Sequence, residues 1–126
     1  MENFLTVNNV NGSFLFSSSE TRRIAMDAVE MALPVVDAVA PFLSEMTHAE
    51  LCIVAHSLRH SLSGDKALRG TVLSDKLKTY PPVYQVSEID ELRGDIETAW
   101  KRLRAVKFLL LTFLMDPSLL ACFLSP

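Results

Sequence analysis

The chain has 126 residues, a formal net charge of −3 and a hydrophobic fraction of 49%. This length predicts one domain, residues 1–126, with a modest core. The small acidic charge argues against a dedicated nucleic-acid-binding protein. Because a domain of this size has few fully enclosed positions, so high a hydrophobic fraction favours burial against a second copy or an obligate protein partner.

The cysteines and the N-terminal sequence predict a cytoplasmic protein. Cys52 and Cys122 stand alone in apolar surroundings, without the spacing of a disulfide framework. The first residues carry no basic stretch of the kind that opens a secretory signal. The apolar segment 105–124 is interrupted by a lysine, an aspartate and a proline. It therefore falls short of the roughly 20 uninterrupted apolar residues that a membrane span needs.

Residues 1–17 predict a β-hairpin. Asn11-Gly12 lies between two apolar-rich runs, which is the typical sequence of a two-residue type I′ turn. In that register four apolar side chains share one face: Leu5, Val7, Phe14 and Phe16. Two strands alone are marginal in water, so we expect this face to lie on the helices or on another chain's hairpin.

Residues 18–79 predict several helical segments, the first of which begins near Ser17. Ser17 and Glu20 have the spacing of a capping box. Pro34 and Pro41 must each begin a new segment or kink a continuing helix. The expected core stripe of this helix consists of Ile24, Ala28, Met31 and Val35, with Ala25, Val29 and Ala32 beside it.

A second capping box, Thr47 with Glu50, predicts a helix over 47–62. A shorter helix follows after Ser63-Gly64-Asp65. Pro81-Pro82 then predicts an extended linker over 80–86, which either docks as a polyproline segment or covers the end of the bundle. The residues expected to point inward are Leu51, Ala55, Leu58 and Leu62 in the longer helix, and Leu68, Val72, Leu73 and Leu77 in the shorter one.

Residues 87–124 predict one long helix, capped by Ser87 and stopped by Asp116-Pro117, and then a short C-terminal helix. The long helix carries one apolar stripe, and its acidic residues are expected mostly on the solvent-facing side. The stripe consists of Ile89, Leu92, Ile96, Ala99, Trp100, Leu103, Val106, Leu110 and Leu114. The acidic residues are Glu88, Asp90, Glu91, Asp95 and Glu97. The fold class is therefore mainly α: an N-terminal hairpin and a bundle of four to five helices organised on this long helix.

The last turns of the long helix lose their polar face. Five large apolar residues occupy helical angles that are charged in the earlier turns: Phe108, Leu109, Leu111, Phe113 and Met115. Leaving them in water would cost on the order of 10 kcal/mol, at roughly 1.5–3 kcal/mol for each side chain. They are therefore either a partner-binding or oligomerisation surface, or the centre of the domain wrapped by neighbouring segments. Lys107 falls on the apolar stripe and must extend its ammonium group to solvent, unless the helix shifts phase there.

The helix over 47–62 carries His48, Cys52, His56 and His60 at four-residue intervals. Imidazole and thiolate are preferred zinc ligands, and a His pair four residues apart can chelate one ion. Each four-residue step rotates by about 40°, so all four cannot meet one ion. Two interpretations therefore remain. Cys52, His56 and His60 form a zinc or small-ligand site, or the four residues are ordinary residues of the surface and the edge of the core.

No motif in the sequence specifies a reaction. We therefore expect a non-enzymatic protein–protein interaction module: a small homodimeric adaptor, chaperone or inhibitor that acts through the apolar end of the long helix. The alternative is a regulatory protein that binds a metal or a small ligand through the His and Cys residues of the 47–62 helix.

Overall fold

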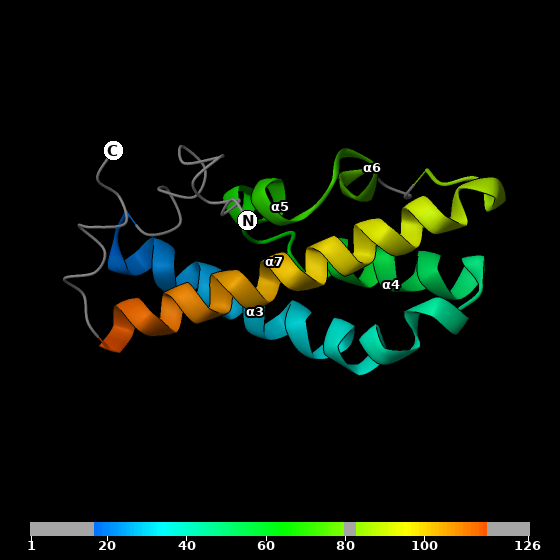
Figure 1. Ribbon diagram of the computed structural model, residues 1–126. Coiled ribbons are helices and arrows are strands. Elements are labelled where there is room, and N and C mark those ends of the chain that lie inside the picture. The colour runs from blue at the N-terminus through cyan, green and yellow to red at the C-terminus, as the bar shows by residue number, and fades with distance from the viewer. Residues whose placement is uncertain (1–16, 80–82, 116–126) are drawn as a thin grey trace, which may run out of the picture.

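The computed structural model describes residues 17–79 and 83–115. Within that part of the chain there are five α-helices, two short 3-10 helices and no strand (Figure 1). The prediction of a mainly α fold is confirmed for these residues. The predicted hairpin turn and its strands fall in 1–16 and the short C-terminal helix in 116–124, so both lie outside the described residues.

Helix α3 (Ser19–Val39) begins one residue later than predicted. Ser18, not Ser17, is the N-cap: its Oγ accepts a hydrogen bond from the Thr21 backbone N–H over 3.1 Å. The Thr21 hydroxyl accepts in turn from the Ser18 N–H over 3.0 Å. The predicted box of Ser17 with Glu20 was therefore wrong, because a threonine at the third helical position can serve in place of the glutamate.

The buried face of α3 is built mostly from small residues. It consists of Ala25, Ala28, Val29, Ala32, Leu33 and Val36. Of the predicted residues, Ala25, Ala28, Val29 and Ala32 are buried. Met31 is 59% exposed and Val35 is 38% exposed, so the buried face is rotated from the predicted stripe. The apolar side chains of α3 cover a wider arc than the surface that packs against the other helices. The side that carries the alanines is the one that packs, because small side chains let neighbouring helices approach closely. Pro34 lies inside the continuous helix, whereas Pro41 opens a new segment, η1 (Ala40–Glu45).

Helix α4 (His48–Ser61) begins with the predicted capping box. Thr47 Oγ1 accepts from the Glu50 N–H over 3.2 Å, and Glu50 Oε1 accepts from the Thr47 N–H over 2.9 Å. The second of these bonds lowers the pKa of Glu50. All four residues predicted to point inward are buried: Leu51, Ala55, Leu58 and Leu62.

The shorter helix predicted after Asp65 is two helices, α5 (Lys66–Val72) and α6 (Asp75–Lys78). The chain breaks at Leu73, which is extended, and Ser74 Oγ then caps α6 by accepting from the Leu77 N–H. The capping serine explains the break, because it competes with the helical backbone for hydrogen bonds. The predicted apolar residues of both helices are buried: Leu68, Val72, Leu73 and Leu77.

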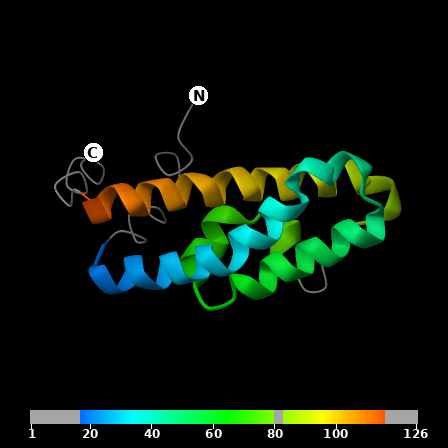
Figure 2. The same cartoon turned by 90° about the horizontal axis from the view of Figure 1, so that it is seen from below.

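The longest helix, α7 (Ile89–Met115), has 27 residues. A 3-10 turn, η2 (Val86–Glu88), leads directly into α7. Ser87 lies within η2 and is therefore not the N-cap of α7, contrary to the sequence prediction. Helix α7 runs antiparallel to α3 along the length of the bundle and also packs on α4 and α5 (Figures 1 and 2). The buried residues of these elements form one hydrophobic cluster, which contains the interior stripe of α7.

Candidate functional site

The apolar end of α7 divides between the core and the surface. Phe113 is 4% exposed, and Leu109 is partly buried against the core. Phe108 is 69% exposed and Leu111 is 44% exposed. Met115 lies in the last turn of α7, and its side chain lies outside the described part. Of the five predicted surface residues, Phe108 and Leu111 thus form an exposed pair, which we call the α7 patch.

Phe113 is buried because the interior stripe of α7 repeats every seven residues. Its fully buried members alternate in steps of four and three: Leu92, Ile96, Ala99, Leu103, Val106, Leu110 and Phe113. A straight helix would favour the position four after Leu110, but a strict seven-residue repeat keeps the stripe on the partner helices. The sequence prediction assigned Phe113 to the opposite face and continued the stripe to Leu114, whose side chain lies outside the described part of the structure.

A second row with the same alternating steps runs along the outer side of α7. It consists of Glu97, Lys101, Arg104, Phe108 and Leu111. Its first part is charged: Lys101 pairs with Glu97 over 3.3 Å, and the Arg104 guanidinium lies 5.1 Å from the centre of the Trp100 ring. The α7 patch therefore forms the C-terminal part of a row whose earlier residues are charged, and the basic side chains of Lys101 and Arg104 border it on its N-terminal side.

The edge of α7 that faces α3 is polar. Trp100 Nε1 donates a hydrogen bond to Asp37 Oδ1 over 2.6 Å. Lys107 is half-buried and lines a hollow of about 220 Å³ with Glu30 and Asp37. The lysine thus borders acidic side chains at the rim of the core, as expected for a residue that buries its stem and extends its ammonium group outward.

The His and Cys residues of α4 divide into two separate pairs. His48 Nε2 donates a hydrogen bond to the Tyr84 carbonyl oxygen over 3.0 Å, and Cys52 Sγ lies 3.8 Å from both nitrogens of that ring. His56 and His60 stack on each other with ring centroids 6.4 Å apart. Among residues 17–79 and 83–115, no group of three or more His, Cys, Asp or Glu side chains is arranged to hold a metal ion.

The contact between Cys52 and His48 does not form a nucleophile–base pair. A thiol aligned with the Nδ1 lone pair would lie much closer to Nδ1 than to Nε2, whereas the two distances are equal. Because Nε2 donates to a carbonyl oxygen, Nδ1 is the accepting nitrogen of the neutral ring. The equal distances place the thiol away from the direction of the Nδ1 lone pair.

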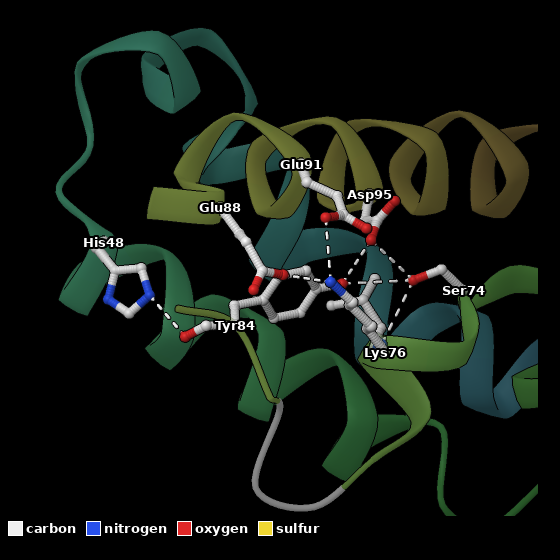
Figure 3. Close-up of polar contacts among 8 residues, drawn as sticks. His48, Ser74, Lys76, Tyr84, Glu88, Glu91 and Asp95 are labelled. Atoms are coloured by element: carbon white, nitrogen blue, oxygen red, sulfur yellow. Dashed lines mark hydrogen bonds and ion pairs between the residues drawn. The ribbon is translucent and has the colours of Figure 1, made fainter. Parts of the chain in front are cut away.

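We call residues 83–88, the segment before α7, the strap. A cluster of polar side chains joins the strap to α6 and α7 (Figure 3). The Tyr84 hydroxyl donates to Asp95 Oδ2 over 2.5 Å, and Ser74 Oγ donates to the same oxygen over 3.1 Å. The pKa of the Tyr84 phenol is raised, mainly by burial and secondly by its hydrogen bond to Asp95. The strap is therefore held at Tyr84 from two sides, by Asp95 through the side chain and by His48 through the backbone.

Ion pairs hold the other end of the strap. Lys76 Nζ contacts the Glu88 carboxylate and also lies 3.1 Å from Glu91 Oε2 (Figure 3). The pKa of Lys76 is raised, mainly by its hydrogen bond to Glu88 and secondly by its hydrogen bond to Glu91. The hydrogen bond between Lys76 and Glu88 also lowers the pKa of Glu88. The ammonium is also 5.5 Å from the centre of the Tyr84 ring. Because these contacts join the strap to α6 and α7, we interpret this cluster as a structural tether.

The sequence analysis missed this tether. Asp95 was expected on the solvent-facing side, yet it is half-buried and accepts two hydrogen bonds. A signal was present: Asp95 is three residues after Leu92 and four before Ala99, so it borders the buried stripe. Tyr84 is only 6% exposed, which agrees with a linker that covers the end of the bundle.

Comparisons with known proteins do not extend these observations. No family model matches the chain, and neither a curated protein nor a solved structure is significantly similar to it. Within the described residues, no helix is both long enough and apolar enough to cross a membrane.

Proposed function

We propose that this chain is a non-enzymatic protein–protein interaction module that associates with a second copy of itself through the α7 patch. One observation carries the proposal: Phe108 and Leu111 are 69% and 44% exposed on one side of a helix whose other side is buried. Residues three apart on a helix are neighbours, so the two side chains form one contiguous apolar surface. A few well-packed anchor residues, often aromatic, supply most of the binding energy at protein interfaces.

The expected strength of the association follows from the size of the patch. Completing the burial of these two side chains contributes roughly 1–2 kcal/mol each, or about 4–8 kcal/mol over both copies of a symmetric dimer. Association itself costs roughly 4–15 kcal/mol in lost translational and rotational freedom. The largest gain less the smallest cost leaves about 4 kcal/mol, so the patch supports only a weak, reversible dimer that dissociates in the millimolar range, as suits an adaptor, chaperone or inhibitor that exchanges partners.

Sedimentation equilibrium on a matched pair of variants tests this proposal. The double variant Phe108→Asp/Leu111→Asp places two charges in the patch and should remain monomeric at about 500 μM, where the unmodified chain associates. Ile53→Asp is the control, because Ile53 is 65% exposed on α4, outside the patch. It should associate like the unmodified chain.

Circular dichroism separates loss of association from loss of folding. Both positions are exposed, so the double variant should keep its helical content and its cooperative unfolding. If the unmodified chain is a monomer at every concentration, or if the double variant still dimerises, self-association through this patch is wrong.

A further inference from the structure

The groove between α3 and α4 contains a hollow that fits a side chain from the segment leading into α3. We propose that residues 10–16, which lie outside the described part of the chain, run back along this groove, and that Phe14 fills the hollow. The contact is made within one copy of the chain. It goes beyond the proposed self-association, because it uses a different surface from the α7 patch.

The hollow has a volume of about 300 Å³ and lies between the N-terminal half of α3 and the turn after α4. On the α3 side, Ile24 and Met31 flank Ala28, whose side chain is too short to fill the space between them. On the α4 side, the lining residues run from His60 to Gly64. Apart from chain neighbours, no described atom lies within 4 Å of the position that a Cβ of Gly64 would occupy. The hollow thus offers an apolar wall and room for a large side chain.

The spacing of apolar residues predicts that this side of α3 is covered. Four of them follow one another in steps of four, three and four, as on the core-facing stripe of a helix: Ile24, Ala28, Met31 and Val35. Met31 is nevertheless 59% exposed and Val35 is 38% exposed, because the other helices pack on the neighbouring side of α3. A contiguous apolar stripe beside a packed face indicates that a further segment lies on it.

The chain that leads into α3 has the position and the length to be this segment. Helix α3 is capped by Ser18, and Met31 lies about 20 Å from this cap along the helix axis. An extended chain advances about 3.3 Å per residue, so the stretch from Val10 to Ser18 spans about 26 Å and reaches past Met31. The backbone bends at Ser17 and Ser18, directly before α3, as a chain that turns back along the helix requires.

The same distances select Phe14 among the apolar residues of this segment. Phe14 is four residues before the cap, about 13 Å along an extended chain, and Ala28 is ten residues after it, about 15 Å along α3. The two residues therefore lie at nearly the same level of the groove. Phe16 shares the face of Phe14, because side chains alternate along an extended segment, and it lies nearer to the start of α3. A phenylalanine ring beside Met31 also makes a favourable contact with the thioether sulfur.

Methionine-methyl NMR spectroscopy tests this contact in the full chain. The methyl groups of the five methionines are labelled with ¹³C, and the Met31 signal is assigned by its loss in Met31→Leu. The sample is kept at about 100 μM, below the millimolar dissociation expected of the α7 patch. The Met31 methyl should show an upfield shift and nuclear Overhauser effects to a phenylalanine ring, and Phe14→Leu should abolish both. Phe123→Leu is the matched control, because it removes a ring from the C-terminal segment, and it should leave both unchanged.

The results distinguish the occupants of the groove. A Met31 methyl without ring contacts in the unmodified chain overturns the proposal, and so does a contact that persists in Phe14→Leu. A contact that is lost in Phe123→Leu instead assigns the groove to the C-terminal segment. A contact that disappears on dilution belongs to a second copy and overturns the assignment within one chain. None of these results depends on the α7 patch, which Phe108→Asp/Leu111→Asp tests separately.

Cross-linking gives a second readout that keeps the ring of Phe14 in place. Ser13→Cys/Asp27→Cys, in a chain whose own two cysteines are replaced by serine, pairs the residue next to Phe14 with an exposed residue of the hollow. A short bismaleimide should join this pair within one chain several-fold faster than it joins Ser13→Cys/Val86→Cys. Val86 is the control because it is exposed in η2, at the opposite end of the bundle from the start of α3 (Figure 1). Equal rates for the two pairs would overturn the proposal, even if Phe14→Leu fails to fold.

Discussion

Tyr84 and Asp95 are 11 residues apart in the sequence, and a 2.5 Å hydrogen bond from the phenol to the carboxylate joins them. This bond fixes the strap to the side of α7 at the point where Ser74, the cap of α6, reaches the same carboxylate. A single acidic residue beside the core stripe thus holds three elements together: the strap, α6 and α7.

Removal of the Tyr84 hydroxyl should destabilise the fold measurably. Tyr84→Phe keeps the buried ring and deletes one hydrogen bond to a charged acceptor, so we expect a loss of about 1–2 kcal/mol in the free energy of unfolding. Urea unfolding monitored by circular dichroism measures it. In an Asp95→Asn background the same change should cost clearly less, and an equal cost in both backgrounds would show that the bond does not contribute.

The stabilisation by Tyr84 should disappear in alkali. The folded state raises the pKa of this phenol above its ordinary value of 10.0, so the folded protein favours the neutral form. A group of this kind contributes its full stabilisation below pH 10 and loses it as the pH rises further. The stability difference between the unmodified chain and Tyr84→Phe should therefore be constant from pH 7 to 9 and shrink at pH 11. A difference that stays constant through pH 11 would contradict this assignment.

Two phenylalanines five residues apart in α7 should respond very differently to truncation. Phe113 is 4% exposed, so Phe113→Ala removes core packing and should cost about 3 kcal/mol. Phe108 is 69% exposed, so Phe108→Ala should change the stability of the monomer by less than about 0.5 kcal/mol. Thermal or urea unfolding at a concentration too low for association makes the comparison. Equal costs would mean that Phe108 is also a core residue.

Gly94 offers a stabilising substitution. It lies in the second turn of α7, is exposed, and has no atom within 4 Å of the position that a Cβ would occupy. Gly94→Ala should therefore stabilise the chain by about 0.5–1 kcal/mol, because alanine loses less backbone entropy on helix formation. A rise in the urea midpoint with an unchanged slope is the expected result, and a fall would indicate a close contact at this position.

The interior of the bundle was largely predictable from apolar spacing and capping residues. The Thr47–Glu50 box, the inward face of α4 and most of the stripe of α7 follow from these local rules. The face of α3 followed only in part: its predicted alanines and Val29 are buried, but its apolar arc is wider than its contact surface, and only the positions of neighbouring helices select Val36 over Met31 and Val35. Long-range packing overrides a local pattern in such cases.

The candidate sites were predictable only where they depend on one helix. The sequence located the apolar end of α7, but the burial of Phe113 depends on how the helix follows its partners. The tether through Tyr84 joins residues 48, 84 and 95, and no local pattern brings such distant positions together. The spacing of the α4 histidines, by contrast, was a strong local pattern that the structure divides into separate pairs.

Sedimentation equilibrium of the unmodified chain over about 5–500 μM is the most direct test of the central claim, that Phe108 and Leu111 form a self-association surface. The account predicts a weight-average mass that rises with concentration from the 14.0 kDa of one chain toward twice that value. The Phe108→Asp/Leu111→Asp variant should stay at the mass of one chain throughout. A constant monomeric mass for the unmodified chain, or the same rise in both proteins, would contradict it.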